Sequence, residues 1–334
     1  MPAEWEPHEG TWLSWPKDPV TFPHRVHKVE QVYCEVMRHL AEGEKVFLLV
    51  DDDAARGRAL RLLSERKVNL HNIVVHVVPT VDVWIRDYGP KFLVCYDQGS
   101  KKKKALAFNH WIFNAWGEKY EELIPDTGVP TRLKPLLNVP VFQPGIVLEG
   151  GSIEVNGRGV CLTTTQCLLN KNRNPHLARK EIEKYLSEYL NAGEVIWLQN
   201  GVEGDDTDGH VDDIARFVAE DTVVCALEDN PKDPNYKPLR ENYEILKERF
   251  QTITLPMPSP IQGQGSRLPA SYANFLIANA CVLVPTYADA SDQRVLGILA
   301  DLFPGRRIAG IDCRDLIWGM GAVHCITQQQ PKSG

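Results

Sequence analysis

The chain has 334 residues, of which 43% are hydrophobic, and its formal net charge is −7 from 37 basic and 44 acidic residues. This composition is typical of a globular protein, and we predict a single domain over residues 1–334. A mildly acidic chain is poorly suited to binding nucleic acid, so we expect no nucleic-acid partner.

The sequence also argues against a membrane or secreted protein. No apolar run approaches the length of a membrane span, and the first residues lack the basic and apolar regions of a signal peptide. Eight cysteines occur without any CxxC pair, mostly in apolar runs, as expected for buried reduced thiols. We therefore expect a cytoplasmic protein. The one basic run, Lys101–Lys104, indicates a solvated hairpin loop, with anion binding as the alternative.

Apolar residues recur at helical spacing in five segments. In chain order, the predicted helices span residues 26–40, 54–63, 182–190, 239–250 and 295–303. Runs of β-branched residues predict strands between them, among them residues 45–50, 73–78 and 308–312.

Five hairpin-like segments recur along the chain, which indicates a repeated unit. They span residues 83–96, 146–163, 210–227, 271–286 and 322–328. Markers near their starts, 62, 61, 62 and 53 residues apart, are Asp87, Glu149, His210, Tyr272 and Cys325. A period of about 60 residues, with a helix in most units, is typical of repeated supersecondary structure. We therefore predict an α/β fold whose five units form a propeller-like ring, closed by residues 11–15 beside the last unit.

The first two units begin with candidate cation-binding acids. In residues 84–90, Asp87 lies near Trp84 and precedes a Gly-Pro turn, an arrangement that suits a cation. The alternative is a plain turn with Trp84 in the core. In residues 148–152, Glu149 precedes two glycines at the end of an apolar run, where a simple turn glutamate is an equal alternative.

The third unit begins with the acidic segment 205–213, which contains His210. At strand spacing His210 and Asp212 point to the same face, so the carboxylate can raise the pKa of a general acid/base imidazole. The acids also suggest a metal site, but they are not in the register of an EF-hand. Histidines elsewhere that we interpret as structural or surface groups are His24, His27, His39 and His176.

The last unit carries Cys325 in a β-type run after the glycine-rich residues 319–322. A lone cysteine is usually a small buried hydrophobic residue, but the glycines and a partner in His210 favour a nucleophile. In a strand, His324 would point to the opposite face, so we interpret it as a packing or hydrogen-bonding residue rather than the base.

One thiol, one imidazole and several carboxylates suit the attack on a planar cation, of which guanidinium is the natural example. A cysteine amidase or protease would leave the surplus carboxylates unexplained. A non-catalytic polyamine- or guanidine-binding protein would need the acids but not Cys325.

The combination of motifs resembles the agmatine deiminases of the Porphyromonas-type peptidyl-arginine deiminase family, within the guanidine-modifying superfamily. The segments that carry the resemblance are residues 2–16, 84–90, 148–152, 208–213, 268–279 and 324–329. The resemblance implies a five-bladed α/β-propeller, the pentein fold, with no cofactor and no metal.

The resemblance also implies residue roles and a reaction. The roles are a covalent nucleophile, Cys325; a general acid/base, His210; carboxylates that hold the guanidinium, Asp87, Glu149 and Asp212; and a channel-lining residue, Trp84. The reaction is hydrolysis of a small guanidine, first of all agmatine to N-carbamoylputrescine and ammonia. Rivals within the class are free arginine, methylated arginine, peptidyl-arginine and an amidinotransferase reaction, and the lack of a secretion signal argues against an exported peptide-modifying enzyme. We expect a small cationic guanidine as partner, and a homo-oligomer as the assembly.

Two departures from the family pattern concern substrate choice. Tyr88 stands where the family often has Thr, and Gly319-Met320-Gly321-Ala322 replaces a Gly-Gly-Gly-Asn approach. Neither removes a group that we expect to take part in the chemistry.

Overall fold

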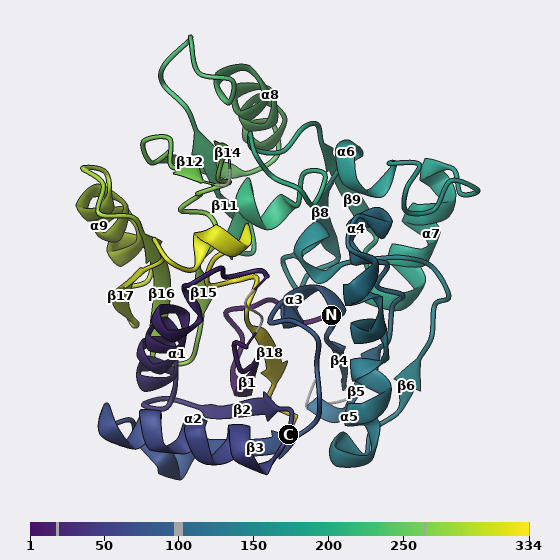
Figure 1. Ribbon diagram of the computed structural model, residues 1–334. Helices are drawn as coiled ribbons and strands as arrows, with labels where there is room; N and C mark the ends of the chain where they lie inside the picture. Colours follow the sequence, from purple (N-terminus) through teal and green to yellow (C-terminus); the bar gives the residue numbers. More distant parts are fainter. Residues whose placement is uncertain (18–19, 97–102, 264, 334) are drawn as a thin grey trace.

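The computed structural model describes residues 1–17, 20–96, 103–263 and 265–333. Strands within these ranges form six sheets, five of which share one plan. The sixth is the small pair of β13 (Gln262–Gly263) and β14 (Ser266–Arg267). Figure 1 shows the five larger sheets grouped around a common centre, with most helices on the outside. This arrangement agrees with the predicted α/β ring.

Each of the five sheets consists of an antiparallel pair extended by parallel pairing. The first sheet is ordered β18 (Gln328–Pro331), β1 (His8–Ser14), β2 (Lys45–Val50) and β3 (Ile73–Val77). The second contains β4 (Lys91–Tyr96), β5 (Lys103–Asn109) and β6 (Val141–Phe142), and the third contains β7 (Glu154–Val155), β8 (Val160–Thr164) and β9 (Glu194–Leu198). The fourth contains β10 (Ala215–Ala219), β11 (Thr222–Leu227) and β12 (Gln251–Pro256), and the fifth contains β15 (Leu276–Ile277), β16 (Cys281–Thr286) and β17 (Arg307–Asp312).

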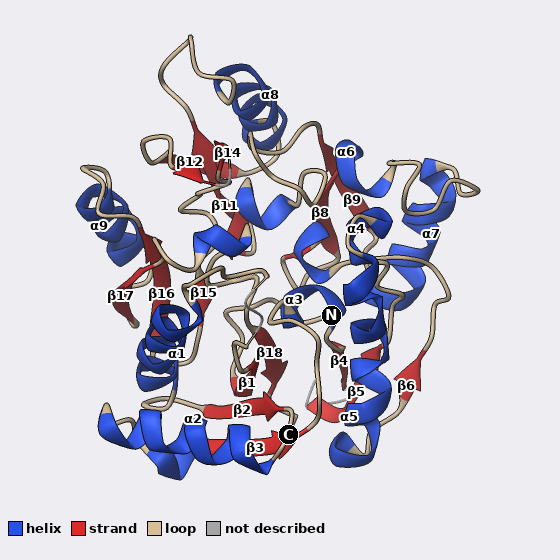
Figure 2. Ribbon diagram, viewed as in Figure 1, coloured by secondary structure: helices blue, strands red, loops and turns tan. Residues whose placement is uncertain are grey.

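Helices connect the parallel strands, because parallel neighbours need a long crossover. These crossover helices are α1 (Val26–Leu40), α2 (Asp53–Glu65), α5 (Val129–Leu137), α7 (Arg179–Leu190), α8 (Tyr236–Lys247) and α9 (Asp292–Leu302). Figure 2 shows them outside the strands. All five helices expected from apolar periodicity are confirmed, since hydrophobic residues at 3.6-residue spacing face a sheet.

The two ends of the chain close the ring as expected. Strand β1 pairs in antiparallel fashion with β18, with Thr11 opposite Gln329, and in parallel fashion with β2. Residues more than 300 positions apart are therefore neighbours in one sheet.

A helical or simple turn precedes the first strand of each repeated unit. These five site turns are α3 (Ile85–Tyr88), η3 (Gly150–Ser152), η4 (Val211–Asp213) and the turns at residues 272–273 and 323–326. Two of the expected hairpins are corrected by this arrangement. Segment 83–96 contains a turn and one strand, β4, which pairs with β5. Segment 322–328 contains a turn and the start of β18, which pairs with β1 at the other end of the chain.

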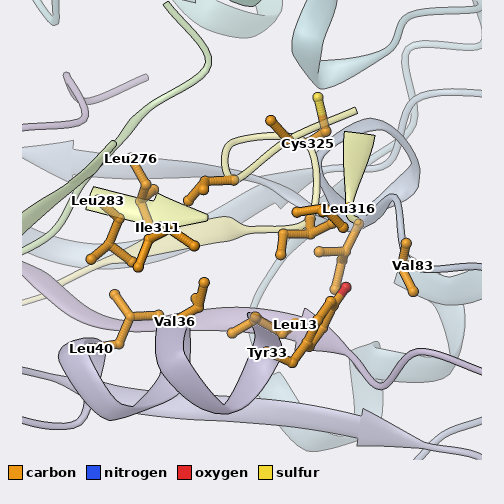
Figure 3. Packing of buried hydrophobic residues seen from close by; sticks show 14 of the residues in the cluster. Leu13, Tyr33, Val36, Leu40, Val83, Leu276, Leu283, Ile311, Leu316 and Cys325 are labelled. Atoms are coloured by element: carbon orange, nitrogen blue, oxygen red, sulfur yellow. The ribbon is translucent and has the colours of Figure 1, made fainter. Parts of the chain in front are cut away.

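The largest apolar cluster includes residues of the first, second, fourth and fifth sheets and extends to the last site turn. Figure 3 shows Leu13, Tyr33 and Leu316 packed in it, with Cys325 at its edge and the sulfur pointing away from the packed side chains. The core therefore fixes the backbone of Cys325 while the thiol faces polar surroundings.

The shorter helices lie in the connections. They are α4 (Ala115–Glu118), α6 (Thr165–Leu168), η1 (Leu70–Asn72), η2 (Glu121–Gly128) and η5 (Ile317–Gly319). Among the described residues, every helix is too short or too polar to cross a bilayer. Of the expected basic loop, Lys103 and Lys104 begin β5, and residues 101–102 lie outside the described residues.

Candidate active site

The site turns bring together all five residues that the sequence assigned to chemistry. They are Asp87 in α3, Glu149 before η3, His210 and Asp212 at η4, and Cys325 in the last turn. All five are buried. Because each turn occupies the same place in its unit, residues up to 238 positions apart meet at one point.

A cavity of about 190 Å³ reaches two of these residues, Asp87 and Cys325. Trp84 also lines it, and its indole Nε1 donates to Asp82 Oδ2 at 2.9 Å. Another part of the lining comes from the connections between strands. We call this part the connection wall, and it consists of Trp116, Tyr120, Leu123, Asp206 and Thr207. Glu149, His210 and Asp212 do not line the cavity but lie next to Asp87 and Cys325.

Gly151 is the point on which the site turns converge. A Cβ atom there would lie 2.5 Å from His210 Nδ1 and 3.0 Å from both Asp212 Oδ2 and Asp87 Oδ1. His210 and Asp212 therefore share one side of the site, as expected, although the reason given was wrong. They lie at the start of a 3₁₀ turn rather than on one face of a strand.

Asp87 is held at the cavity by two donors. Its Oδ1 accepts from the Gly151 amide at 2.9 Å, and its Oδ2 accepts from Trp116 Nε1 at 3.0 Å. The backbone around Trp116 is strained, since Ala115, Trp116 and Glu118 all have φ between 52° and 63°. Such strain is concentrated at functional sites, and here it aims an indole at a buried carboxylate. Burial raises the pKa of Asp87, while the charge of nearby His210 opposes that rise.

His210 lies between acids, with its Nδ1 3.7 Å from Asp87 Oδ1. Burial alone would lower the pKa of His210, but Asp87, Cys167 and Asp212 raise it well above its ordinary value. The acids around it therefore favour the charged form of the imidazole. Its buried Nε2 has no hydrogen-bond partner among the described residues.

Glu149 is already bound by a cation inside the protein. Arg173 Nε donates to Glu149 Oε1 at 2.6 Å, which leaves Glu149 Oε2 buried with no partner among the described residues. Glu149, Cys167 and His210 place potential metal ligands within 4.8 Å of one another. The guanidinium of Arg173 adds a fixed positive charge to this group, and that charge disfavours a metal ion.

The Sγ atom of Cys325 lies 3.9 Å from Asp212 Oδ2. Burial raises the pKa of the Cys325 thiol well above its ordinary value, and the carboxylates of Asp212, Asp213 and Asp87 add to this rise. The resting thiol is therefore protonated at neutral pH.

His324 positions Asp212, as a hydrogen-bonding residue and not as a base facing the thiol. Its Nδ1 lies 2.7 Å from Asp212 Oδ2, and its Nε2 lies 2.9 Å from Glu4 Oε2. The expected strand at Cys325 was wrong. The amides of His324 and Cys325 bond to Asn274 Oδ1 at 2.9 and 3.4 Å, so they are not available to a strand ladder, and the segment forms a turn.

The glycine-rich approach makes room for Trp84. A Cβ atom on Gly321 would lie 2.5 Å from Trp84 Cζ3, and one on Gly319 would lie 2.8 Å from Trp84 Cζ2. Met320 between them has φ 72° and lines the cavity. Tyr88, the other departure from the family pattern, points away from the cavity lining, where its hydroxyl bonds to Ser14 Oγ at 2.8 Å. Of the two departures, only the glycine-rich segment touches the cavity.

Sequence reasoning missed several residues of the site, namely Trp116, Cys167, Arg173 and Asn274, and it noted Asp206 and Asp213 only as part of the acidic segment 205–213. Trp116, Cys167 and Arg173 lie in connections, outside the repeated turns, so the repeat could not reveal them. Asn274 had a usable signal: it follows the marker Tyr272 by two residues, as Asp212 follows His210.

Comparisons with known proteins agree with this geometry. The family model for Porphyromonas-type peptidyl-arginine deiminase matches residues 1–331. The chain belongs to this family. The resemblance expected from the motifs is thereby confirmed.

Similar proteins match this chain over nearly their full length. A Legionella pneumophila protein provisionally named an agmatine deiminase is 40% identical over 345 residues, covering 100% of this chain and 95% of the relative. The agmatine deiminase of Enterococcus faecalis is 30% identical with a TM-score of 0.91, covering 99% of this chain and 95% of that one. A cysteine-to-serine variant of the C. jejuni agmatine deiminase, solved with substrate bound, is 32% identical with a TM-score of 0.89, covering 100% and 96% of the two chains. These likenesses confirm the fold class.

Proposed function

We propose that the protein hydrolyses agmatine to N-carbamoylputrescine and ammonia, with Cys325 as the nucleophile. The observation that carries the proposal is that a cavity-lining thiol lies beside buried carboxylates with unused hydrogen-bond acceptors. Glu149 Oε2 and Asp212 Oδ1 are both buried without a hydrogen-bond partner among the described residues. Buried acceptors are rarely left unpaired, so such atoms suit the N–H groups of a guanidinium. The same reaction class is named in the similar agmatine deiminases.

The proposed mechanism uses the five residues that the site turns bring together. The guanidinium binds to Asp87, with Glu149 and Asp212 completing the acidic surroundings. Its positive charge offsets the carboxylates that hold the Cys325 thiol protonated, so the thiol releases its proton to solvent, and the resulting thiolate attacks the guanidinium carbon. His210 donates a proton to the departing nitrogen, ammonia leaves, and an amidino-thioether remains on Cys325.

The second half restores the enzyme. His210, now neutral, takes a proton from a water that attacks the same carbon. The bond to Cys325 Sγ breaks, the sulfur regains a proton as the new C–O–H group loses its own, and the ureido product leaves. Because the mechanism needs charged His210 first, activity falls as pH rises through the elevated pKa of His210. Activity should also fall at low pH, because the carboxylates that bind the guanidinium become protonated. The expected pH profile is therefore bell-shaped.

The cavity favours agmatine over arginine. Asp82, Glu122 and Asp206 all line it. Carboxylates attract the primary ammonium of agmatine and repel the α-carboxylate that arginine carries in addition. Free arginine and peptidyl-arginine therefore remain the second candidates, and a non-catalytic guanidine-binding protein is the alternative of another class.

One assay separates these candidates. The protein is incubated with agmatine, arginine and a blocked arginyl peptide, and ammonia and ureido product are measured for wild type, Cys325→Ala and Cys225→Ala. The control Cys225 is a buried thiol in β11 that faces apolar residues. We expect turnover of agmatine first, its loss in Cys325→Ala, and its retention in Cys225→Ala. If no guanidine yields a ureido product the proposed activity is wrong, and turnover by Cys325→Ala would contradict the mechanism.

Three further expectations belong to the proposal. We propose one domain over residues 1–334, because β1 and β18 share a sheet and the site draws on all parts of the chain. A cytoplasmic location is supported by eight cysteines that are all free. Metal-independence and a homo-oligomeric state stay predictions, to be checked by activity after chelation and by light scattering.

A further inference from the structure

The thiol of Cys325 lies in surroundings that oppose its reactive form. Asp87 approaches from α3, and His210, Asp212 and Asp213 approach from η4. The three carboxylates raise the free energy of a thiolate beside them. A bound guanidinium offsets part of this charge only until the reaction converts it to a neutral ureido group. A permanent donor to the sulfur would therefore assist every step in which the thiolate forms or departs.

Asn274 supplies such a donor. Its side-chain Nδ2 donates to Cys325 Sγ at 3.1 Å and to Asp213 Oδ1 at 3.0 Å. Among the described residues it is the only side-chain donor to this sulfur. Asn274 is fully buried and lies just before β15, in the unit that contributes no other residue to the reaction.

The orientation of the Asn274 amide is fixed by its own hydrogen bonds. Its Oδ1 accepts from the amides of His324 and Cys325, so the oxygen must face the backbone and the nitrogen must face the sulfur. Asp213 holds the second hydrogen of the nitrogen. Burial, together with Asp212 and Asp205, raises the pKa of Asp213 well above its ordinary value.

We propose that Asn274 is a further catalytic residue, whose amide N–H stabilises the thiolate of Cys325. A hydrogen bond to an ionised acceptor is about twice as strong as one between neutral groups, so this donor favours the thiolate over the thiol. Asp213 acts through Asn274 and is a positioning residue. The proposal rests on Cys325 as the nucleophile and adds a thiolate-stabilising group that belongs to the protein and not to the substrate.

The test measures the thiol without any guanidine. Iodoacetamide alkylation of Cys325 is followed from pH 6 to pH 10 in wild type, Asn274→Ala and Asn274→Asp, with the rate at Cys325 read by peptide mass spectrometry. Asn274→Ala removes the donor without adding charge. Asn274→Asp keeps the oxygen that binds the two backbone amides and replaces the N–H with a second carboxylate oxygen, so a wild-type midpoint in this variant would contradict the proposal even if Asn274→Ala fails to fold.

We expect both variants to react about 10- to 100-fold more slowly than wild type at pH 8, the range that a hydrogen bond to a charged group contributes. The midpoint of rate against pH should rise accordingly. With agmatine, kcat should fall by a similar factor while KM changes little, because Asn274 does not line the cavity.

Asn242→Ala is the matched control. Asn242 is equally buried, and both ends of its amide are hydrogen-bonded: it accepts from Gln199 N at 2.8 Å and donates to Asn200 O at 2.8 Å. Its loss should lower stability without moving the alkylation midpoint. Wild-type midpoints in both Asn274 variants would overturn the proposal. The alkylation measurement needs no substrate, so it tests the role of Asn274 even if agmatine proves not to be turned over.

Discussion

The site turns and the connection wall enclose the same cavity but are built in different ways. The site turns repeat at the start of each unit, and they bring together buried groups that are held by one another and by the backbone. The connection wall comes from non-repeated segments between β5 and β6 and between β9 and β10, and its Tyr120 and Asp206 are partly exposed. The difference suggests a division of labour, with the chemistry fixed by the repeat and the choice of substrate made by the connections.

This division predicts that crowding the site turns abolishes activity. In Gly151→Ala, the new Cβ would lie within 3.0 Å of three reacting or binding groups, so His210, Asp212 or Asp87 must move. A displacement of about 1 Å can lower the rate about 100-fold, and we expect at least that loss in kcat/KM for agmatine. Gly297→Ala is the control, because a Cβ there, in helix α9, meets nothing within 4 Å. Wild-type kinetics in Gly151→Ala would show that the turns tolerate rearrangement and would break the comparison.

A change in the connection wall should affect binding and not chemistry. Asp206 Oδ2 accepts from the Tyr120 hydroxyl at 2.6 Å and lines the cavity. In Asp206→Asn a carboxylate charge of the cavity lining is lost, so KM for the proposed substrate agmatine should rise about 10-fold or more at unchanged kcat. The preference for agmatine over arginine should shrink. The exposed Glu203→Gln serves as control, and a fall in kcat alone would assign Asp206 to the chemistry instead.

The same residue predicts a pH effect on KM. Burial raises the pKa of Asp206 from 3.8 to about 6. Below that pH the carboxyl is protonated and neutral, and a cationic substrate binds more weakly. KM for agmatine should therefore rise as pH falls through 6, by about tenfold at pH 5. Asp206→Asn should abolish this dependence, and an unchanged pH profile in that variant would contradict the assignment.

The smallest expected effect concerns Tyr272, which stands at a repeated position but outside the site. Tyr272 occupies the marker position of its unit, yet its hydroxyl donates to Asp292 at 2.6 Å and takes no part in the site. Tyr272→Phe should lower the free energy of unfolding by about 1–2 kcal/mol and leave kcat and KM within about twofold of wild type. Thermal unfolding with kinetics on the same sample checks this. A large kinetic loss would mean that the Tyr272 hydroxyl takes part in the site, as the marker side chains of the other units do.

Much of the fold was accessible from the sequence, because apolar periodicity and the spacing of about 60 residues are local or regular signals. The helices, the repeat, the closure of the ring and the set Asp87, Glu149, His210, Asp212 and Cys325 all followed from these signals or from the family motifs. The local structure at His210 and Cys325 did not. Strand spacing was assumed there, but hydrogen bonds from distant residues, such as Asn274 Oδ1 to the amide of Cys325, make these segments turns.

The sequence by itself determined which chemical groups are present and that they recur at equivalent places in a ring. Only the tertiary structure decided what surrounds each group: Arg173 on Glu149, Trp116 on Asp87, and Asn274 on Cys325. The physical reason is that a side chain's protonation and reactivity depend on burial and on charges within a few ångströms. Those neighbours come from segments far apart in the chain, whose meeting no local pattern records.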